Sequence, residues 1–251
     1  MLFHFTVFFW TVIFYLGLQT VAVNLIFPTW TGYILSVVPL IIISLLASRR
    51  LTKRYADAFL PGLLSLTAPT LLLLIDHVTK RQIFVVVSAI MYYFSLLGIY
   101  RLRHAPTDKT AKSLLYSAAM AAMFFFYAGL YGFYLNFDFP LWGLMLLFFL
   151  GTALTSFETF IGVDKDQRNR VRTYSALLGL IMGEMAWVES FWPFGYLTTG
   201  ALTLIFFFVI LDISVDGFRN KLSLKKATLR LLFFLGLVTL LLLSSSWRIL
   251  V

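Results

Sequence analysis

Cysteine is absent from the 251-residue sequence, and charged residues make up only 12% of it. Without a thiol, the chain cannot form disulfides, use a thiolate nucleophile, or hold zinc or an iron–sulfur cluster through cysteine. Soluble domains average about 25% charged residues. Because no segment is polar enough to form a soluble domain, we expect residues 1–251 to be a single integral membrane domain.

Several catalytic motifs are also missing. The sequence contains no GxxxxGK[ST] phosphate loop, no HExxH and no Gly-x-Ser-x-Gly, which disfavours nucleotide hydrolysis, a metalloprotease and a serine hydrolase. The three histidines (His4, His77 and His104) are widely separated, so we predict no metal site. We predict no cofactor, and enzyme activity stays open but disfavoured.

Apolar residues dominate what is present. Hydrophobic residues account for 61% of the chain, and the mean hydropathy is +0.91, so lipid must be the solvent for much of the surface. The apolar runs are continuous and do not alternate as barrel strands do. We therefore predict an all-α, polytopic transmembrane bundle built largely from antiparallel hairpins. Its nine spans are expected at 5–27, 30–47, 57–75, 82–100, 113–135, 140–162, 173–192, 195–212 and 227–247.

Basic residues recur in every second connection between these spans. The four basic loops hold Arg49, Arg50, Lys53, Arg54; Arg101, Arg103, Lys109, Lys112; Lys165, Arg168, Arg170, Arg172; and Arg219, Lys221, Lys225, Lys226. With Arg230, 17 of the 20 Lys and Arg residues lie on one side. The positive-inside rule then predicts a cytoplasmic N-terminus and an outward C-terminus, in a plasma membrane of prokaryotic type. The net charge of +9 is assigned to lipid head groups and not to nucleic acid.

Two carboxylates in the seventh span are candidate ligand-binding or proton-binding groups. Glu184 is about eleven residues into its span, near the bilayer midplane, where a charged side chain costs about 2.5–3.5 kcal/mol. We expect it to face the protein interior and to be largely protonated, either as a functional group or as a structural hydrogen-bonding group. Glu189 is expected near the outer interface, where an ordinary hydrated carboxylate is the simpler interpretation.

Further candidates come from polar stripes and small residues. Glu158 and Thr155 share a stripe of the sixth span, and Gln19 belongs to a similar stripe in the first span. Such stripes indicate either a polar cavity or helix packing. Gly179 and Gly183 form a GxxxG pair that predicts a close helix contact.

The remaining candidates lie at span ends. The outer tip between the third and fourth spans is polar and is the better candidate for an external binding loop, through Asp76, His77, Lys80 and Arg81. Asp212 and Arg230 end neighbouring spans, so an ion pair between them is expected to orient and stabilise those helices.

Three functions remain compatible with this pattern. The first is a membrane-embedded subunit or scaffold of a larger assembly, with the lipid bilayer and other membrane subunits or a homo-oligomer as partners. The second is a small proton-coupled or facilitative transporter that uses a midplane carboxylate. The third is an intramembrane lipid-modifying enzyme. No motif in the sequence identifies a substrate.

Overall fold

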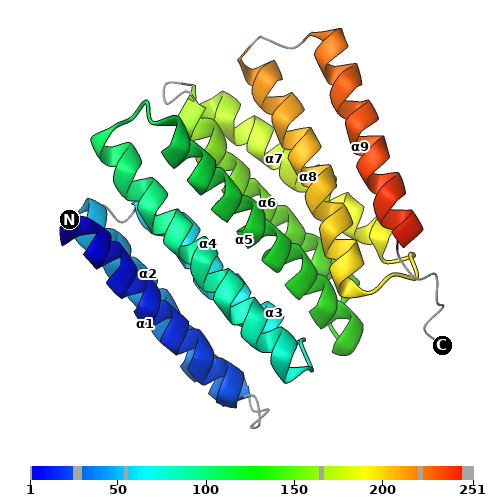
Figure 1. The fold of residues 1–251 in the computed structure, drawn as a ribbon. Helices are drawn as coiled ribbons and strands as arrows, with labels where there is room; N and C mark the ends of the chain where they lie inside the picture. Colours follow the sequence, from blue (N-terminus) through cyan, green and yellow to red (C-terminus); the bar gives the residue numbers. More distant parts are fainter. Residues whose placement is uncertain (1, 25–29, 54–55, 164–166, 220–222, 245–251) are drawn as a thin grey trace. The chain divides into compact units, whose positions relative to one another are not determined.

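The predicted all-α class is confirmed. The computed structural model describes residues 2–24, 30–53, 56–163, 167–219 and 223–244, and these residues form nine α-helices and one 3₁₀ turn (Figure 1). The elements are α1 (Leu2–Asn24), α2 (Trp30–Thr52), η1 (Ala56–Ala58), α3 (Phe59–Leu72), α4 (Val78–His104), α5 (Lys109–Asn136), α6 (Leu141–Val163), α7 (Arg168–Glu189), α8 (Tyr196–Phe218) and α9 (Leu224–Ser244). Each predicted span overlaps one of these helices.

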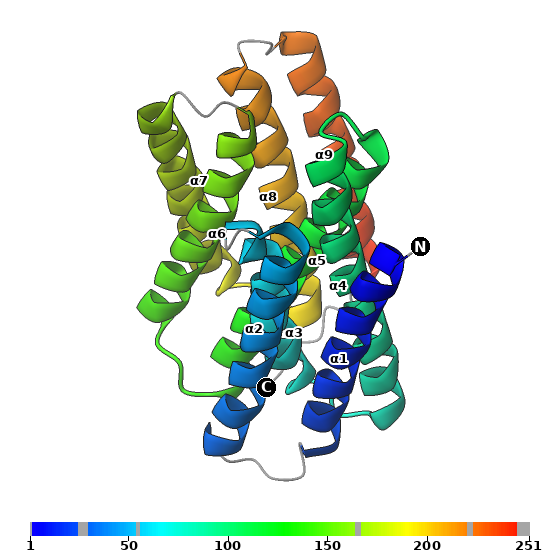
Figure 2. The same cartoon turned by 90° about the vertical axis from the view of Figure 1, so that its left-hand side faces the viewer.

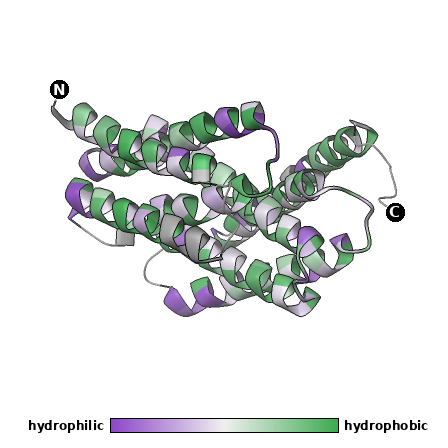
Figure 3. Cartoon of the chain, turned by 90° about the horizontal axis from the view of Figure 1, so that it is seen from below, coloured by the Kyte–Doolittle hydropathy of each residue, from purple (hydrophilic) through white to green (hydrophobic). Residues whose placement is uncertain are grey.

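Six of the described helices are long and apolar enough to cross a membrane: α1, α4, α5, α6, α8 and α9. Helix α3 is not among them because it has only 14 residues. Helix α7 is not among them and begins with three arginines. Figure 3 shows hydrophobic residues along most of the helices and the most hydrophilic segments at helix ends. The chain is therefore a polytopic helical protein of the membrane.

The described residues pack as two compact units, residues 1–126 and 127–251, and the boundary falls within α5. In the first unit, α1 contacts both α2 and α4, and α3 contacts α2 and α4. Figure 2 shows α1 beside α4, although α2, η1 and α3 lie between them in the chain. Phe14 of α1 stacks on Tyr92 of α4 with ring centroids 4.0 Å apart, and Gln19 donates to the Gln82 side chain over 3.0 Å. These contacts make α1 a partner of α4.

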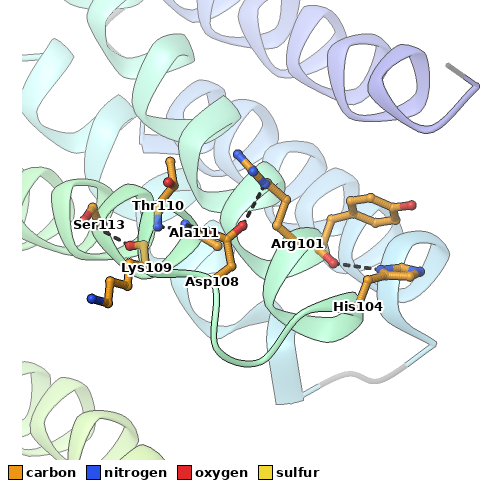
Figure 4. Close-up of polar contacts among 8 residues, drawn as sticks. Arg101, His104, Asp108, Lys109, Thr110, Ala111 and Ser113 are labelled. Carbon is orange, nitrogen blue, oxygen red and sulfur yellow. Dashed lines mark hydrogen bonds and ion pairs between the residues drawn. The ribbon is translucent and has the colours of Figure 1, made fainter.

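The connection between α4 and α5 is fixed by a carboxylate. Asp108 accepts hydrogen bonds from the backbone amides of Thr110 and Ala111 at the start of α5, as an N-capping side chain does. Its other oxygen lies 3.0 Å from Nε of Arg101, near the end of α4 (Figure 4). The α4–α5 loop thus uses one of its basic residues to hold the turn.

In the second unit, α6 and α7 make the most extensive helix pair, and α8 contacts both α7 and α9. Arg230 of α9 joins α8 through two ion pairs, to Asp212 and to Asp216, each at 2.8 Å. The expected ion pair is thus present and extends to a second carboxylate one helical turn along α8. A groove of about 350 Å³ lies beside it, lined by Phe208, Val209, Asp212, Leu229, Arg230 and Phe233.

Candidate functional site

Glu189, the last residue of α7, is completely buried. The interpretation of this side chain as a hydrated interfacial carboxylate is wrong. The reason is tertiary: α8 packs against α7 and presents Thr203 to the carboxyl group, so water does not reach it. A buried carboxyl group in an apolar unit is costly unless it is neutral or hydrogen-bonded.

Thr203 is the hydrogen-bonding partner of the Glu189 carboxyl group. The distance from Thr203 Oγ1 to Glu189 Oε2 is 2.6 Å, and the same hydroxyl lies 2.8 Å from the backbone carbonyl oxygen of Thr199. The second carboxyl oxygen, Oε1, is buried without a hydrogen-bond partner, and so is the Thr199 hydroxyl one turn earlier on α8. The carboxyl group is therefore held at one oxygen only.

Two tyrosines of α5 complete the polar interior of this unit. Tyr131 donates to the backbone carbonyl oxygen of Glu189 over 2.7 Å, and Tyr127 shares a 2.8 Å hydrogen bond with Thr152 of α6. Both tyrosines and Thr152 are buried. We call Glu189, Thr199, Thr203 and Tyr131 the Glu189 cluster, which brings α5, α7 and α8 together at the end of α7.

Tyr127, Tyr131, Thr199 and Thr203 are not among the candidates predicted from the sequence. A signal for them is present, because the two tyrosines recur with a spacing of four on α5, as Thr199 and Thr203 do on α8. Residues four apart share a helix face. Such pairs are common in apolar helices, and only tertiary packing brings them to one carboxyl group.

Glu184 has the opposite environment: it is exposed on α7. The expectation that Glu184 faces the interior is therefore wrong. At 3.6 residues per turn, five residues correspond to a rotation of about 140° around the helix axis. Because Glu189 faces the core of the unit, Glu184 must point away from it.

The rotation of α7 is set by its two glycines, which lie against α6. A β-carbon added to Gly179 would be 2.7 Å from the carbonyl oxygen of Phe149, and one added to Gly183 would be 3.1 Å from that of Met145. The α6 backbone thus occupies the space that side chains would need. Because the glycine face of α7 packs against α6, Glu184 lies on the side of α7 that points away from α6.

Two hydroxyl groups of the polar stripe of α6 bond back to the helix itself. Thr155 donates to the carbonyl oxygen of Gly151, and Thr159 donates to that of Thr155, which are hydrogen bonds within one helix. Glu158 is exposed on the same helix. In the first unit, Gln19 is paired with Gln82.

The outer-loop candidates belong to the first unit. Asp76, His77 and Lys80 are exposed, and Arg81 donates from Nε to the carbonyl oxygen of Ile75. Arg81 therefore stabilises the α3–α4 turn. Within the described residues, no group of three or more His, Asp or Glu side chains could hold a metal ion.

Comparisons of the chain with protein-family models, curated proteins and solved structures find no match. Helix α7 thus carries two carboxyl groups in contrasting environments, Glu189 buried in the Glu189 cluster and Glu184 exposed. The apolar helices that surround them indicate an integral membrane location.

Proposed function

We propose that this protein is a membrane-embedded subunit that docks against a different membrane protein through the outer face of α7. The observation that carries the proposal is the exposure of Glu184 in the middle of an apolar helix face. The partner would supply a cationic or hydrogen-bond-donating side chain at the same depth. In this assembly the chain contributes helices and a recognition surface.

The outer face of α7 forms a continuous apolar stripe around Glu184. The exposed members of this docking stripe are Leu177, Leu180, Ile181, Trp187 and Val188. Spacings of three, four and seven residues put them on the same side as Glu184. A stripe of this kind suits lipid or another helix, but the carboxylate suits only a polar partner.

The depth of Glu184 makes lipid an unsuitable neighbour. Counted from Thr173, after the last arginine of the α7 start, eleven residues at 1.5 Å per residue put Glu184 about 16 Å into the helix, near the middle of a hydrocarbon core of about 30 Å. A glutamate side chain is too short to reach the interface from there. Intramembrane carboxylates typically pair with another polar group.

Charge favours a different protein over a second copy of this chain. The described Lys and Arg residues all lie in loops or within about two turns of a helix end, so the described part of a second copy offers no cation at the depth of Glu184. Two copies meeting at the docking stripe would bring two carboxylates together, which opposes association. A partner helix with Lys, Arg or His near its middle avoids this.

Site-specific photocrosslinking in intact membranes tests the proposal. A photoreactive amino acid at Ile181, three residues from Glu184, should give an adduct with one membrane protein that carries a basic residue at midspan. The same group at Leu154, an exposed position on α6, is the matched control and should give lipid adducts. In a Glu184→Leu background the Ile181 adduct should fall at least tenfold, since the polar contact is lost.

Three outcomes would overturn the proposal. These are adducts with lipid alone at Ile181, adducts with a second copy of the chain, and an adduct yield unchanged by Glu184→Leu. Because Glu184 is exposed, the leucine variant should fold normally, and an unchanged melting temperature in detergent verifies this.

A second candidate function, a small proton-coupled transporter, is favoured by the buried Glu189 cluster. A carboxyl group in an apolar interior is the type of group that binds protons in transporters. In reconstituted vesicles with an imposed pH gradient, Glu189→Gln should then abolish proton flux and Glu184→Gln should leave it unchanged. No flux in the wild-type protein would dismiss this function.

We also propose a cytoplasmic N-terminus and an outward C-terminus in a plasma membrane of prokaryotic type. The support is the recurrence of basic residues in every second loop. The exposed face of α7 would then span from a cytoplasmic start, rich in arginine, to an outer end rich in aromatic residues.

A further inference from the structure

We propose that Glu189 is a proton-binding site, occupied in this conformation, in which the neutral carboxylic acid donates its hydrogen to Thr203. Glu189 lies in the interior of the second unit, so its protonation is independent of what binds the docking stripe. The Thr203 hydroxyl accepts from the neutral acid and can donate to the ionised carboxylate. The proton is released only when α7 and α8 separate.

The Thr203 hydroxyl makes more close contacts than it has hydrogens. A threonine hydroxyl has one hydrogen to donate, yet Thr203 Oγ1 lies within hydrogen-bond distance of two oxygens, Glu189 Oε2 at 2.6 Å and the Thr199 carbonyl oxygen at 2.8 Å. The carbonyl oxygen can only accept. Each contact is a full two-centre hydrogen bond only if Glu189 supplies the second hydrogen, from a protonated carboxyl group.

An ionised Glu189 would satisfy the same geometry less well. The carboxylate could accept from Thr203, but the 2.8 Å contact to the Thr199 carbonyl would then hold two acceptors with no hydrogen between them. Its buried Oε1 would also remain without a partner, and an ionised oxygen without a hydrogen bond is expensive in an apolar interior. In the neutral acid, Oε1 is only a weak acceptor, so leaving it without a partner costs less.

The ionisable groups described around Glu189 agree with a neutral acid. Among the described residues, no Lys, Arg or His forms an ion pair with it. Tyr127 and Tyr131 are the ionisable groups of α5 that interact with it, α8 presents Thr199 and Thr203, and Glu184 on its own helix points away. Tyr131 donates to the Glu189 backbone and supplies no positive charge.

Release of the proton requires α7 and α8 to separate enough for water to enter. The O–H bond of Glu189 would then break, and the proton would pass to a water molecule while the electron pair stays on Oε2. The Thr203 hydroxyl can rotate away from the Thr199 carbonyl and donate to the new carboxylate. Thr203 thus serves both protonation states with one hydrogen, and the α7–α8 contact controls which state exists.

Infrared difference spectroscopy of the purified full-length protein in lipid nanodiscs tests this assignment. Wild type minus Glu189→Gln should contain a carboxylic acid carbonyl band at neutral pH that shifts in D₂O. The matched difference, wild type minus Glu184→Gln, should lack the Glu189 band, because Glu189 is present in both proteins. A wild-type minus Glu189→Gln spectrum with only carboxylate bands at neutral pH would overturn the proposal.

The Thr203 variants keep the test decisive if Glu189→Gln does not fold. Thr203→Val removes the acceptor of the acid hydrogen, so the acid band should move to higher frequency, and Thr203→Ser should restore it. A band that is insensitive to both variants would overturn the role of Thr203. Absence of any buried acid band in both wild type and Thr203→Val would overturn the protonation itself.

Discussion

At the scale of single residues, hydroxyl groups hold the end of α7. Tyr131 reaches from α5 to the Glu189 backbone carbonyl, which also accepts from the Trp192 amide. The tyrosine ring is buried, so its hydroxyl would lack a partner without this contact. The hydrogen bond links α5 to α7 at the Glu189 cluster.

Tyr131→Phe should therefore lower the free energy of unfolding by about 1 kcal/mol, the typical net contribution of one hydrogen bond. The loss should be modest because the Trp192 amide still satisfies the carbonyl. Tyr134→Phe, one turn away and less buried, should change the stability much less. Thermal unfolding in mild detergent measures both, and equal effects would contradict the role of the Tyr131 hydroxyl.

The proposed neutral Glu189 also predicts how stability depends on pH. The folded protein holds the proton, whereas unfolding exposes the side chain to water, where a glutamate is ionised at neutral pH. Unfolding thus releases a proton, so stability should be greatest in mild acid and fall as the pH rises. Melting temperatures between pH 5 and pH 9 should show this slope in wild type. The slope should be reduced in Glu189→Gln and kept in Glu184→Gln.

At the scale of elements, glycine contacts determine how the helices of the second unit are rotated. Gly179 lies against the α6 backbone, whereas a β-carbon at Gly162 of α6 would meet nothing within 4 Å. Alanine is favoured over glycine in helices by up to about 1 kcal/mol. The two positions thus separate helix propensity from steric contact.

Gly179→Ala should destabilise the protein by about 1–3 kcal/mol, the usual range for overpacking, because its β-carbon would overlap a backbone oxygen that cannot move aside. Gly162→Ala should be neutral or slightly stabilising. Chemical or thermal unfolding in detergent distinguishes them. If both variants shift stability in the same direction by similar amounts, the close contact has no energetic weight.

How far the sequence predicts the fold also depends on these contacts. Helix positions followed from apolar length alone, because a bilayer requires about 20 residues per span. The orientation of α7 about its axis did not follow from apolar length. Its buried residues nevertheless form a helical stripe, which contains Met182, Gly183, Ala186 and Glu189. The depth of a residue along the helix can be calculated from its position in the sequence, whereas the direction in which it points depends on how the helix packs. Depth alone led to the wrong orientation for Glu184.

At the scale of the whole molecule, topology is the property most open to measurement, because the sequence has no cysteine. Thr107 and Ser223 are exposed in loops predicted to be cytoplasmic, and Thr79 and Asp138 are exposed near turns predicted to be outside. Thr52 is fully buried and is a poor labelling position. Exposed positions on both sides make the test two-sided.

Single cysteines at Thr79 and Asp138 should react with a membrane-impermeant maleimide in intact cells. Cysteines at Thr107 and Ser223 should react only after permeabilisation, since basic loops face the cytoplasm. All four should react in detergent, which verifies that the thiols are accessible. The inverse pattern would reverse the proposed orientation, and a mixed pattern would change the number of spans.

The pairing of α1 with α4 has a consequence for biogenesis. Gln19 and Gln82 are separated by 63 residues, so at about 5–20 residues per second a ribosome needs about 3–13 s to deliver the second amide after the first. During this interval α1 is already made, but its amide has no partner in the chain. The nascent first helix must therefore wait beside the insertion machinery or α2 until α4 emerges, and the first unit can close only after roughly its first hundred residues have been synthesised.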